Sequence, residues 1–304
     1  MIFAVFPNLG KKEFYTLFKR LEDIFASMHI TCVFPDYYRE SAEKHGLFLK
    51  PEQYRSLNWI GNNASCVISI GGDGTYLSLA CTMAEYEVLQ VGIHMGDFGF
   101  LNLISQDELE QRIHDLYTGN YLVEDRIFLD ADLVHTDGTR QSLPLALNDI
   151  VVGHNEIGKM VRLNLSINDL FIQTYAADGV IVSSATGSTS YSLSCGGPVL
   201  PADSREILVV PVCTHTGLRS PLLIPEGGSV QITIPEREKK VHISLDGTYS
   251  YSMTPEDKLI VRGRKQKIRF IRFRDQDFYR MLTRKFAQYA KNEEVVFGGQ
   301  HETF

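Results

Sequence analysis

The ten residues Cys66–Thr75, CVISIGGDGT, decide the fold class of this chain. The run Cys66–Ile70 is largely apolar and has the length of a strand, and the glycines that follow let the backbone turn tightly into a helix. A continuous apolar run, in place of an alternating one, is typical of a strand buried on both faces. We therefore expect a mostly parallel sheet covered by helices, with the Gly71–Thr75 loop at the end of one strand.

The sequence around this stretch repeats the alternation of strand and helix. An apolar stripe at helical spacing runs from Phe14 to Met28, and a helix is expected from about Tyr76 to Tyr86. Further apolar strands are expected at Ile2–Phe6, Ile30–Phe34 and Val88–Ile93. The first part of the chain is therefore predicted to be an α/β domain.

The pattern changes near Gly119. From Tyr121 onward, strand-length runs are separated by the turn dipeptides Asp137-Gly138, Asn168-Asp169 and Asp246-Gly247. Val161–Ile167 alternates apolar and polar residues, as a half-exposed antiparallel strand does. A helical stripe returns only at Phe278–Tyr289. We predict an α/β domain over 1–119, a β-rich domain over 120–274, and a C-terminal helix, 275–304, that packs back on the body.

Composition excludes several classes of protein. The 304 residues include 30 Lys and Arg against 37 Asp and Glu, a net charge of −7, with 44% hydrophobic and 22% charged residues. This is globular composition, and it disfavours a nucleic-acid partner or an anionic membrane, both of which need basic surfaces. The five cysteines are widely spaced without a CxxC pair, so we predict no metal site among them. Met1–Pro7 lacks the features of a signal peptide, so we expect a reducing cytoplasm.

The Gly71–Thr75 loop carries the sharpest chemical signal. Glycines let a ligand approach the backbone closely, and the N–H groups at the start of the next helix can bind phosphate oxygens. The loop is neither a GxGxxG motif nor a P-loop. Asp73 would repel a phosphate in the ground state, so it makes sense if it accepts a hydroxyl proton or helps to hold a divalent metal. The alternative is an ordinary strand-to-helix turn.

Two further segments have ligand-binding chemistry. In Asp178–Pro198, DGVIVSSATGSTSYSLSCGGP, a short strand leads into a loop rich in hydroxyls and glycines and then into a short helix. Such a segment can bind a sugar–phosphate–base ligand, although hydroxyl-rich loops are usually only solvated. The pair Asn148-Asp149 suits the two hydroxyls of a ribose, but Asn-Asp is also a common turn.

Taken together, these segments resemble the NAD kinase family. The matching blocks follow the family's order along most of the chain: Gly71–Thr75, Asn148-Asp149, Asp178–Pro198, Pro211–Pro225 and Ile243–Thr248. The glycine-rich pentapeptide alone is shared with lipid kinases and phosphofructokinases. The resemblance implies a Rossmann-like N-terminal domain, a β-sandwich-like C-terminal domain, and an active site in the cleft between them. Thr248 stands where the family often has glutamine.

The resemblance also assigns roles to individual residues. It implies that Asp73 is the catalytic proton acceptor. The positions that it matches to NAD contacts are Asp73, Gly74, Asn148, Asp149, Lys159, Ala176, Asp178, Thr189, Ser190, Tyr191, Ser192, Leu193 and Ser194. It assigns no residue as a dedicated metal ligand.

The function that follows is ATP-dependent phosphorylation of the 2′-hydroxyl of the adenosine ribose of NAD, giving NADP. ATP would be the phosphate donor, and Mg²⁺ or Mn²⁺ would neutralise the triphosphate because no Lys/Arg cluster is apparent. The loop Pro7–Lys12 could add a phosphate contact, or it could be a solvated helix start. The resemblance suggests a homodimer or homotetramer.

Two alternatives remain from the sequence. A lipid kinase of the diacylglycerol or sphingosine type would share the glycine loop, but it would not need the block that ends at Pro198. A non-catalytic NADP-binding regulator would gain by losing the charge of Asp73, so the presence of that residue argues against it.

Overall fold

The computed structural model describes residues 1–96, 99–154, 159–236 and 240–287. Contacts divide the chain into two compact units: the first holds Met1–Leu79, Val88–Val123 and Phe270–Phe304, and the second holds Ala80–Glu87 and Glu124–Arg269.

The first unit is built on a parallel sheet, as the sequence predicts. Its strands lie in the order β3-β2-β1-β4-β5, and each neighbouring pair is parallel. The strands are β1 (Ile2–Pro7), β2 (Thr31–Pro35), β3 (Tyr54–Arg55), β4 (Cys66–Gly71) and β5 (Leu89–His94). The strand β4 is buried along its whole length, which explains its continuous apolar run.

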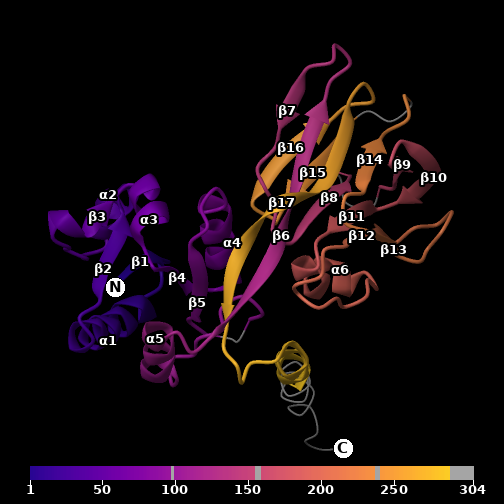
Figure 1. The fold of residues 1–304 in the computed structure, drawn as a ribbon. Helices are drawn as coiled ribbons and strands as arrows, with labels where there is room; N and C mark the ends of the chain where they lie inside the picture. Colours follow the sequence, from indigo (N-terminus) through magenta and orange to yellow (C-terminus); the bar gives the residue numbers. More distant parts are fainter. Residues whose placement is uncertain (97–98, 155–158, 237–239, 288–304) are drawn as a thin grey trace, which may run out of the picture. The chain divides into compact units, whose positions relative to one another are not determined.

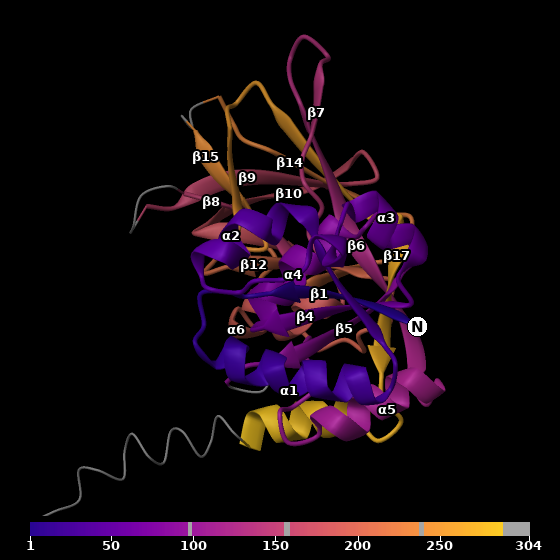
Figure 2. The ribbon, with the colours of Figure 1, turned by 90° about the vertical axis from the view of Figure 1, so that its left-hand side faces the viewer.

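Helices cover both faces of this sheet. Figure 2 shows α1 and α5 on one side of the strands and α2 and α3 on the other. The helices of the unit are α1 (Glu13–Ser27), α2 (Arg39–Lys44), α3 (Leu57–Asn63), α5 (Leu109–Thr118) and the greater part of α4 (Asp73–Thr82). The predicted stripe on α1 is buried, and Phe18 packs edge-on against Phe34 of β2 with ring centroids 5.3 Å apart.

One helix begins and ends earlier than predicted. The helix α4 starts at Asp73, not near Tyr76, and it ends at Thr82, before Tyr86. Asp73 and Gly74 therefore form its first turn. A carboxylate is favourable at a helix N-terminus because it faces the positive end of the helix dipole. This compensates for the weak helix propensity of the two residues.

The C-terminal segment is anchored to α5 by Arg112. The guanidinium donates to both carboxylate oxygens of Asp275, at 2.9 and 2.7 Å, and lies over the ring of Phe273. Residues 278–287 are helical, and Met281 is buried. The structure thus shows a packed helix over residues 278–287 of the predicted segment 275–304. Residues 288–304 lie outside the described residues.

The second unit consists of antiparallel strands in two sets. One set has the order β13-β12-β11-β8-β15-β16, and the other has the order β10-β9-β14-β17, with β6 paired to β17 and β7. The strands are β6 (Leu122–Val134), β7 (Arg140–Ser142), β8 (Asp149–Gly153), β9 (Val161–Ile167), β10 (Leu170–Ala177), β11 (Gly179–Ser183), β12 (Ile207–Val212), β13 (Leu222–Ile224), β14 (Ser229–Thr233), β15 (Val241–Leu245), β16 (Tyr249–Met253) and β17 (Lys258–Arg272). Figure 1 shows these strands in magenta to orange, and β17 in golden yellow.

The inward faces of the two sets form one core. Ile150 and Val152 of β8 belong to the same buried cluster as Val161, Leu163 and Leu165 of β9. The alternation predicted for β9 is confirmed, because these three residues are buried and those between them are half-buried. An α/β unit, a unit of antiparallel sheets and a C-terminal helix are the predicted fold class.

The turn dipeptides behave as predicted. Asn168 and Asp169 both have positive φ, 50° and 65°, and connect β9 to β10 as a type I′ turn would. Asp246 and Gly247, at 48° and 65°, do the same between β15 and β16. Within the described residues, no helix has both the length and the apolar character needed to cross a membrane.

Candidate functional site

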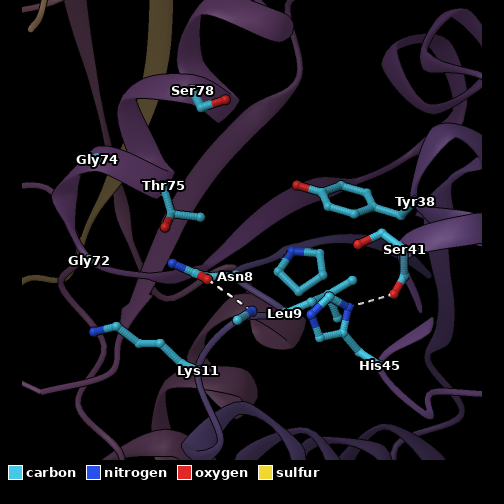
Figure 3. Close-up of a pocket in the computed structure, with 12 residues that line it drawn as sticks. Asn8, Leu9, Lys11, Tyr38, Ser41, His45, Gly72, Gly74, Thr75 and Ser78 are labelled. Carbon is cyan, nitrogen blue, oxygen red and sulfur yellow. Dashed lines mark hydrogen bonds between the residues drawn. The ribbon is translucent and has the colours of Figure 1, made fainter. Parts of the chain in front are cut away.

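The first unit contains a cavity at the carboxyl ends of β1 and β4. It has a volume of about 620 Å³, and Figure 3 shows the side chains that face it. Its lining comes from the glycine loop and α4, from the loop after β1, and from η1 (Asp36–Tyr38) and α2. The carboxyl edge of a parallel sheet is the usual place for a ligand in an α/β fold.

Two loops form one wall of this cavity. Gly72, Gly74 and Thr75 contribute the glycine loop and the first turn of α4. The loop after β1 lies beside them, where the Asn8 side chain accepts from the backbone N–H of Gly10 at 3.2 Å. Lys11 also lines the cavity, and its ammonium group donates to the carbonyl of Met95 at 3.0 Å. A helix N-terminus and a fixed cation therefore face the same space, an arrangement suited to phosphate.

The other wall carries groups that suit a base or a sugar. Tyr38, Ser41 and His45 line the cavity, and Figure 3 shows the Tyr38 ring and the His45 ring on the side away from Gly74. The His45 Nδ1 lies 2.8 Å from the carbonyl oxygen of Ser41, which fixes the plane of the imidazole. This wall was not predicted from the sequence, because short helices such as α2 show no long periodic pattern.

Asp73 is held from one side by the segment after β5. Its Oδ2 accepts from the backbone N–H of Phe100 at 3.2 Å, and its Oδ1 accepts from the side-chain amide of Asn102 at 3.1 Å. Asp73 is not among the described residues that line the cavity, although both of its neighbours are. The carboxylate is therefore oriented by the protein itself and is partly exposed.

The other predicted residues lie in the second unit, where Asn148 and Asp149 stand at the start of β8. The carboxylate of Asp246 accepts from three consecutive backbone N–H groups, those of Leu147 at 2.7 Å, Asn148 at 2.8 Å and Asp149 at 3.0 Å. Asp246 thereby fixes the backbone that carries the pair. The sequence places Asp246 in a turn dipeptide and in a family block, but neither signal predicts this role for its carboxylate.

Asp149 is a buried carboxyl group, 5% exposed, next to a second one. Burial, and then the charge of Asp246, raise the pKa of Asp149 to about 7. Burial also raises the pKa of Asp246, although the three N–H donors oppose this. Two nearby carboxyl groups cannot both ionise cheaply, so the pair holds a proton near neutral pH.

The hydroxyl-rich loop divides into buried and exposed members. Ser184 donates to the carbonyl of Leu147 and accepts from the N–H of Gly187, and Ser188 donates to Ala185 and accepts from the N–H of Leu200. These buried hydroxyls hold the loop and are thus occupied by the protein. The sequence pattern predicted that the serines of this segment bind a ligand. Part of the serine content is instead explained by these hydrogen bonds within the loop.

The predicted contact residues of this loop lie in η3 (Thr186–Thr189), in α6 (Tyr191–Ser194) and at Ser190 between them. Ser190, Tyr191 and Ser194 are exposed, Thr189 and Leu193 are half-buried, and Ser192 is buried. The Ser192 Oγ has no hydrogen-bond partner within the described part of the chain. A Cβ on Gly197 would overlap that Oγ and lie 2.8 Å from the Ser192 carbonyl oxygen, so only glycine fits there.

The remaining predicted residues lie on β10, just before β11 and just before β9. Asp178 is exposed and precedes β11, where its N–H donates to Val212 at 3.0 Å. Ala176 is half-buried on β10, and its carbonyl accepts from the N–H of His215 at 2.9 Å. Lys159 is exposed. Burial raises the pKa of Tyr191, with Cys195, Cys213 and Asp178 nearby adding to the effect.

Family models match both parts of the chain. The ATP-NAD kinase N-terminal domain matches residues 5–121, and the ATP-NAD kinase C-terminal domain matches residues 147–273. The chain belongs to the NAD kinase family. Among its relatives, an NAD kinase of Desulforamulus reducens is 33% identical over 83% of this chain and 86% of its own length. An NAD kinase of Pseudomonas fluorescens is 30% identical over 95% of this chain and 96% of its own length.

Solved structures of NAD kinase type share the fold. Yeast NADH kinase complexed with NADH superposes with a TM-score of 0.78 at 20% identity, covering 100% of this chain and 89% of that one. An NAD kinase from Archaeoglobus fulgidus in complex with ATP gives a TM-score of 0.70 at 20% identity, covering 90% of this chain and 94% of that one. The match of an NAD kinase model to residues 147–273 disfavours the lipid kinase alternative.

Proposed function

We propose that this chain is an NAD kinase, transferring the terminal phosphoryl group of ATP to the 2′-hydroxyl of the adenosine ribose of NAD. The observation that carries the proposal is the Asp73 carboxylate, fixed in the first turn of α4 next to a cavity with phosphate-binding groups. The relatives named NAD kinase support the reaction, and the Archaeoglobus fulgidus complex with ATP supports the donor.

The donor is proposed to occupy the cavity of the first unit. The N-terminus of α4 and Lys11 would bind the phosphates, because backbone N–H groups and an ammonium group both complement anionic oxygens. Tyr38 and His45 would face the base and ribose. An inorganic polyphosphate has no base, so substitutions of these two rings distinguish the two kinds of donor.

The acceptor is proposed to bind the residues that the sequence assigns to NAD, among them Asp73 and Gly74. Asn148 and Asp149 would contact the ribose hydroxyls, since an amide and a carboxyl group can donate and accept. The predicted residues of the loop would bind the rest of the dinucleotide, with further contacts from Lys159, Ala176 and Asp178: these loop residues are Thr189, Ser190, Tyr191, Ser192, Leu193 and Ser194. The yeast complex with NADH supports a dinucleotide as ligand.

In the proposed reaction, Asp73 accepts the proton of the 2′-hydroxyl. The hydroxyl oxygen forms a new bond to the terminal phosphorus, the bond from that phosphorus to the bridging oxygen breaks, and ADP leaves with the electron pair. Asp73 offers a carboxylate oxygen of the kind that Mg²⁺ prefers, and Mg²⁺ commonly binds through one or two carboxylates plus substrate phosphates. A bound Mg²⁺ or Mn²⁺ would neutralise phosphate charge.

The family resemblance also suggests an oligomeric state and a cellular compartment for the enzyme. We propose a cytoplasmic homodimer or homotetramer that acts without nucleic acid or membrane. Size-exclusion chromatography with light scattering measures the assembly directly.

Asp73→Asn tests the proposal. The amide is nearly isosteric but cannot accept the proton, so kcat should fall by about 10²–10⁴-fold while NAD still binds. NADP formation is followed with an NADP-specific dehydrogenase, and NAD affinity by calorimetry. Asp23→Asn, on the exposed face of α1, is the matched control and should keep wild-type turnover.

Near-normal turnover of a folded Asp73→Asn would remove Asp73 from catalysis. A wild-type protein that makes no NADP from ATP or polyphosphate, with Mg²⁺ or Mn²⁺, would instead favour the non-catalytic NADP-binding regulator.

A further inference from the structure

A row of three residues crosses the parallel sheet of the first unit next to Asp73. Ser69 on β4 pairs in register with Gly92 on β5. Beyond β5, the backbone N–H of Ile104 donates to the carbonyl of Gly92 at 2.9 Å, so the segment that contains Asn102 runs beside that strand. Ser69 and Asn102 therefore flank Gly92 in the sheet.

The glycine lets the outer two side chains meet. Neighbouring strands lie about 4.8 Å apart, so side chains two strands apart meet only if the middle residue leaves room. The Ser69 hydroxyl donates to the Asn102 Oδ1 at 2.8 Å. A Cβ on Gly92 would overlap the Asn102 side chain and lie 2.9 Å from its Cα.

The same Asn102 amide also hydrogen-bonds to Asp73. Its Nδ2 donates to the Asp73 Oδ1 at 3.1 Å. Both Asn102 and Ser69 are fully buried, at 0% exposure, so their geometry is set by packing and not by solvent. The carboxylate needs a donor, and the amide oxygen would repel it, so only one orientation of the amide satisfies all three groups.

A second glycine, Gly99, lies close against the opposite side of the Asp73 carboxylate. A Cβ on Gly99 would overlap both oxygens of Asp73. With the Phe100 N–H on Oδ2, the carboxylate has one donor on each oxygen and backbone close against it. Each carboxylate oxygen can accept more than one hydrogen bond, so capacity remains for a substrate proton.

We propose that Asn102 is a positioning residue that, supported by Ser69 across Gly92, sets the orientation of the Asp73 carboxylate for proton acceptance. The inference rests on the proposed function of Asp73. A displacement of a reacting group by about 1 Å can cost about 10²-fold in rate, and this is the effect that the buried amide prevents.

Asn102→Ala tests the proposal in the full chain. We expect kcat to fall about 10–100-fold while the KM for NAD and the calorimetric affinity for NADP change less than about threefold. Ser69→Ala, which removes the outer support only, should lower kcat by a smaller factor. The matched control is Gln90→Leu. This variant removes a different buried side-chain amide, which lies on β5, and it should leave kcat unchanged.

A double-mutant cycle separates positioning from a structural role. If Asn102 acts through Asp73, then adding Asn102→Ala to Asp73→Asn should change the remaining turnover by less than about twofold. A full kcat loss in both backgrounds, an equal loss of NADP affinity, or wild-type kcat in Asn102→Ala would overturn the proposal. Failure of Asp73 as proton acceptor appears separately, as near-normal turnover of Asp73→Asn alone.

Discussion

Replacing Asp149 by asparagine should change how the stability of the protein depends on pH. Asp149 is buried beside Asp246, and its pKa rises from 3.8 to about 7. The folded state therefore keeps this proton to higher pH than the unfolded chain does. Between about pH 4 and pH 7 the folded state binds more protons, so the free energy of unfolding falls as pH rises.

The size of the effect follows from the same values. One pKa unit corresponds to 1.36 kcal/mol, so a pKa raised from 3.8 to about 7 gives up to about 4 kcal/mol. Asparagine has no proton to lose. The free energy of unfolding of Asp149→Asn minus that of the wild type should therefore rise by up to about 4 kcal/mol from pH 4 to pH 8.

The assay is urea unfolding followed by circular dichroism at half-unit steps of pH, without nucleotide. Asp178→Asn removes an exposed carboxylate of the same unit and should give a curve that follows the wild type. A difference between Asp149→Asn and wild type that stays constant within about 1 kcal/mol across this range would refute the reasoning from burial.

Three further substitutions test other contacts. Asn148→Ala should leave the fold intact and weaken NAD binding ten- to a hundredfold, about 1–3 kcal/mol, by calorimetry; unchanged affinity would exclude Asn148 from the site. Arg112→Met removes the ion pair with Asp275 and should lower the free energy that holds the C-terminal segment in place by about 1 kcal/mol. Proteolysis within 270–287 should then be faster, and an unchanged digestion pattern would contradict this anchor. Gly197→Ala should lower Tm and weaken NAD binding together, because its Cβ overlaps Ser192; a wild-type Tm would show that the loop accommodates it.

The regular elements could be predicted from the sequence because their signals are local. The continuous apolar run of β4 reflects burial on both faces of the strand, and the apolar stripe of α1 reflects burial on one face of the helix. The hairpin at Asn168-Asp169 follows from residues that tolerate positive φ. The elements between 36 and 65 were not predicted, because helices of six or seven residues are too short for a periodic pattern.

The candidate site was predictable only where its residues are chemically unusual in their local setting. Asp73 stands out because an acid lies among glycines. Asn102 does not, since its importance comes from the register that places it beside Gly92 and from its contact with Asp73. Asp246 likewise acts on backbone groups about a hundred residues away, a relationship that no local pattern contains.

The space at Gly92 links two positions in any mutational path. Alanine at 92 would overlap the side-chain amide of Asn102 and would also lie 2.9 Å from the Asn102 Cα, so removing the amide relieves only part of the overlap. Gly92→Ala should therefore be most harmful in the wild type and less harmful, but still unfavourable, once Asn102 has been replaced by alanine. In a combinatorial library, glycine should therefore be retained at 92 whatever residue stands at 102, and most strictly beside asparagine.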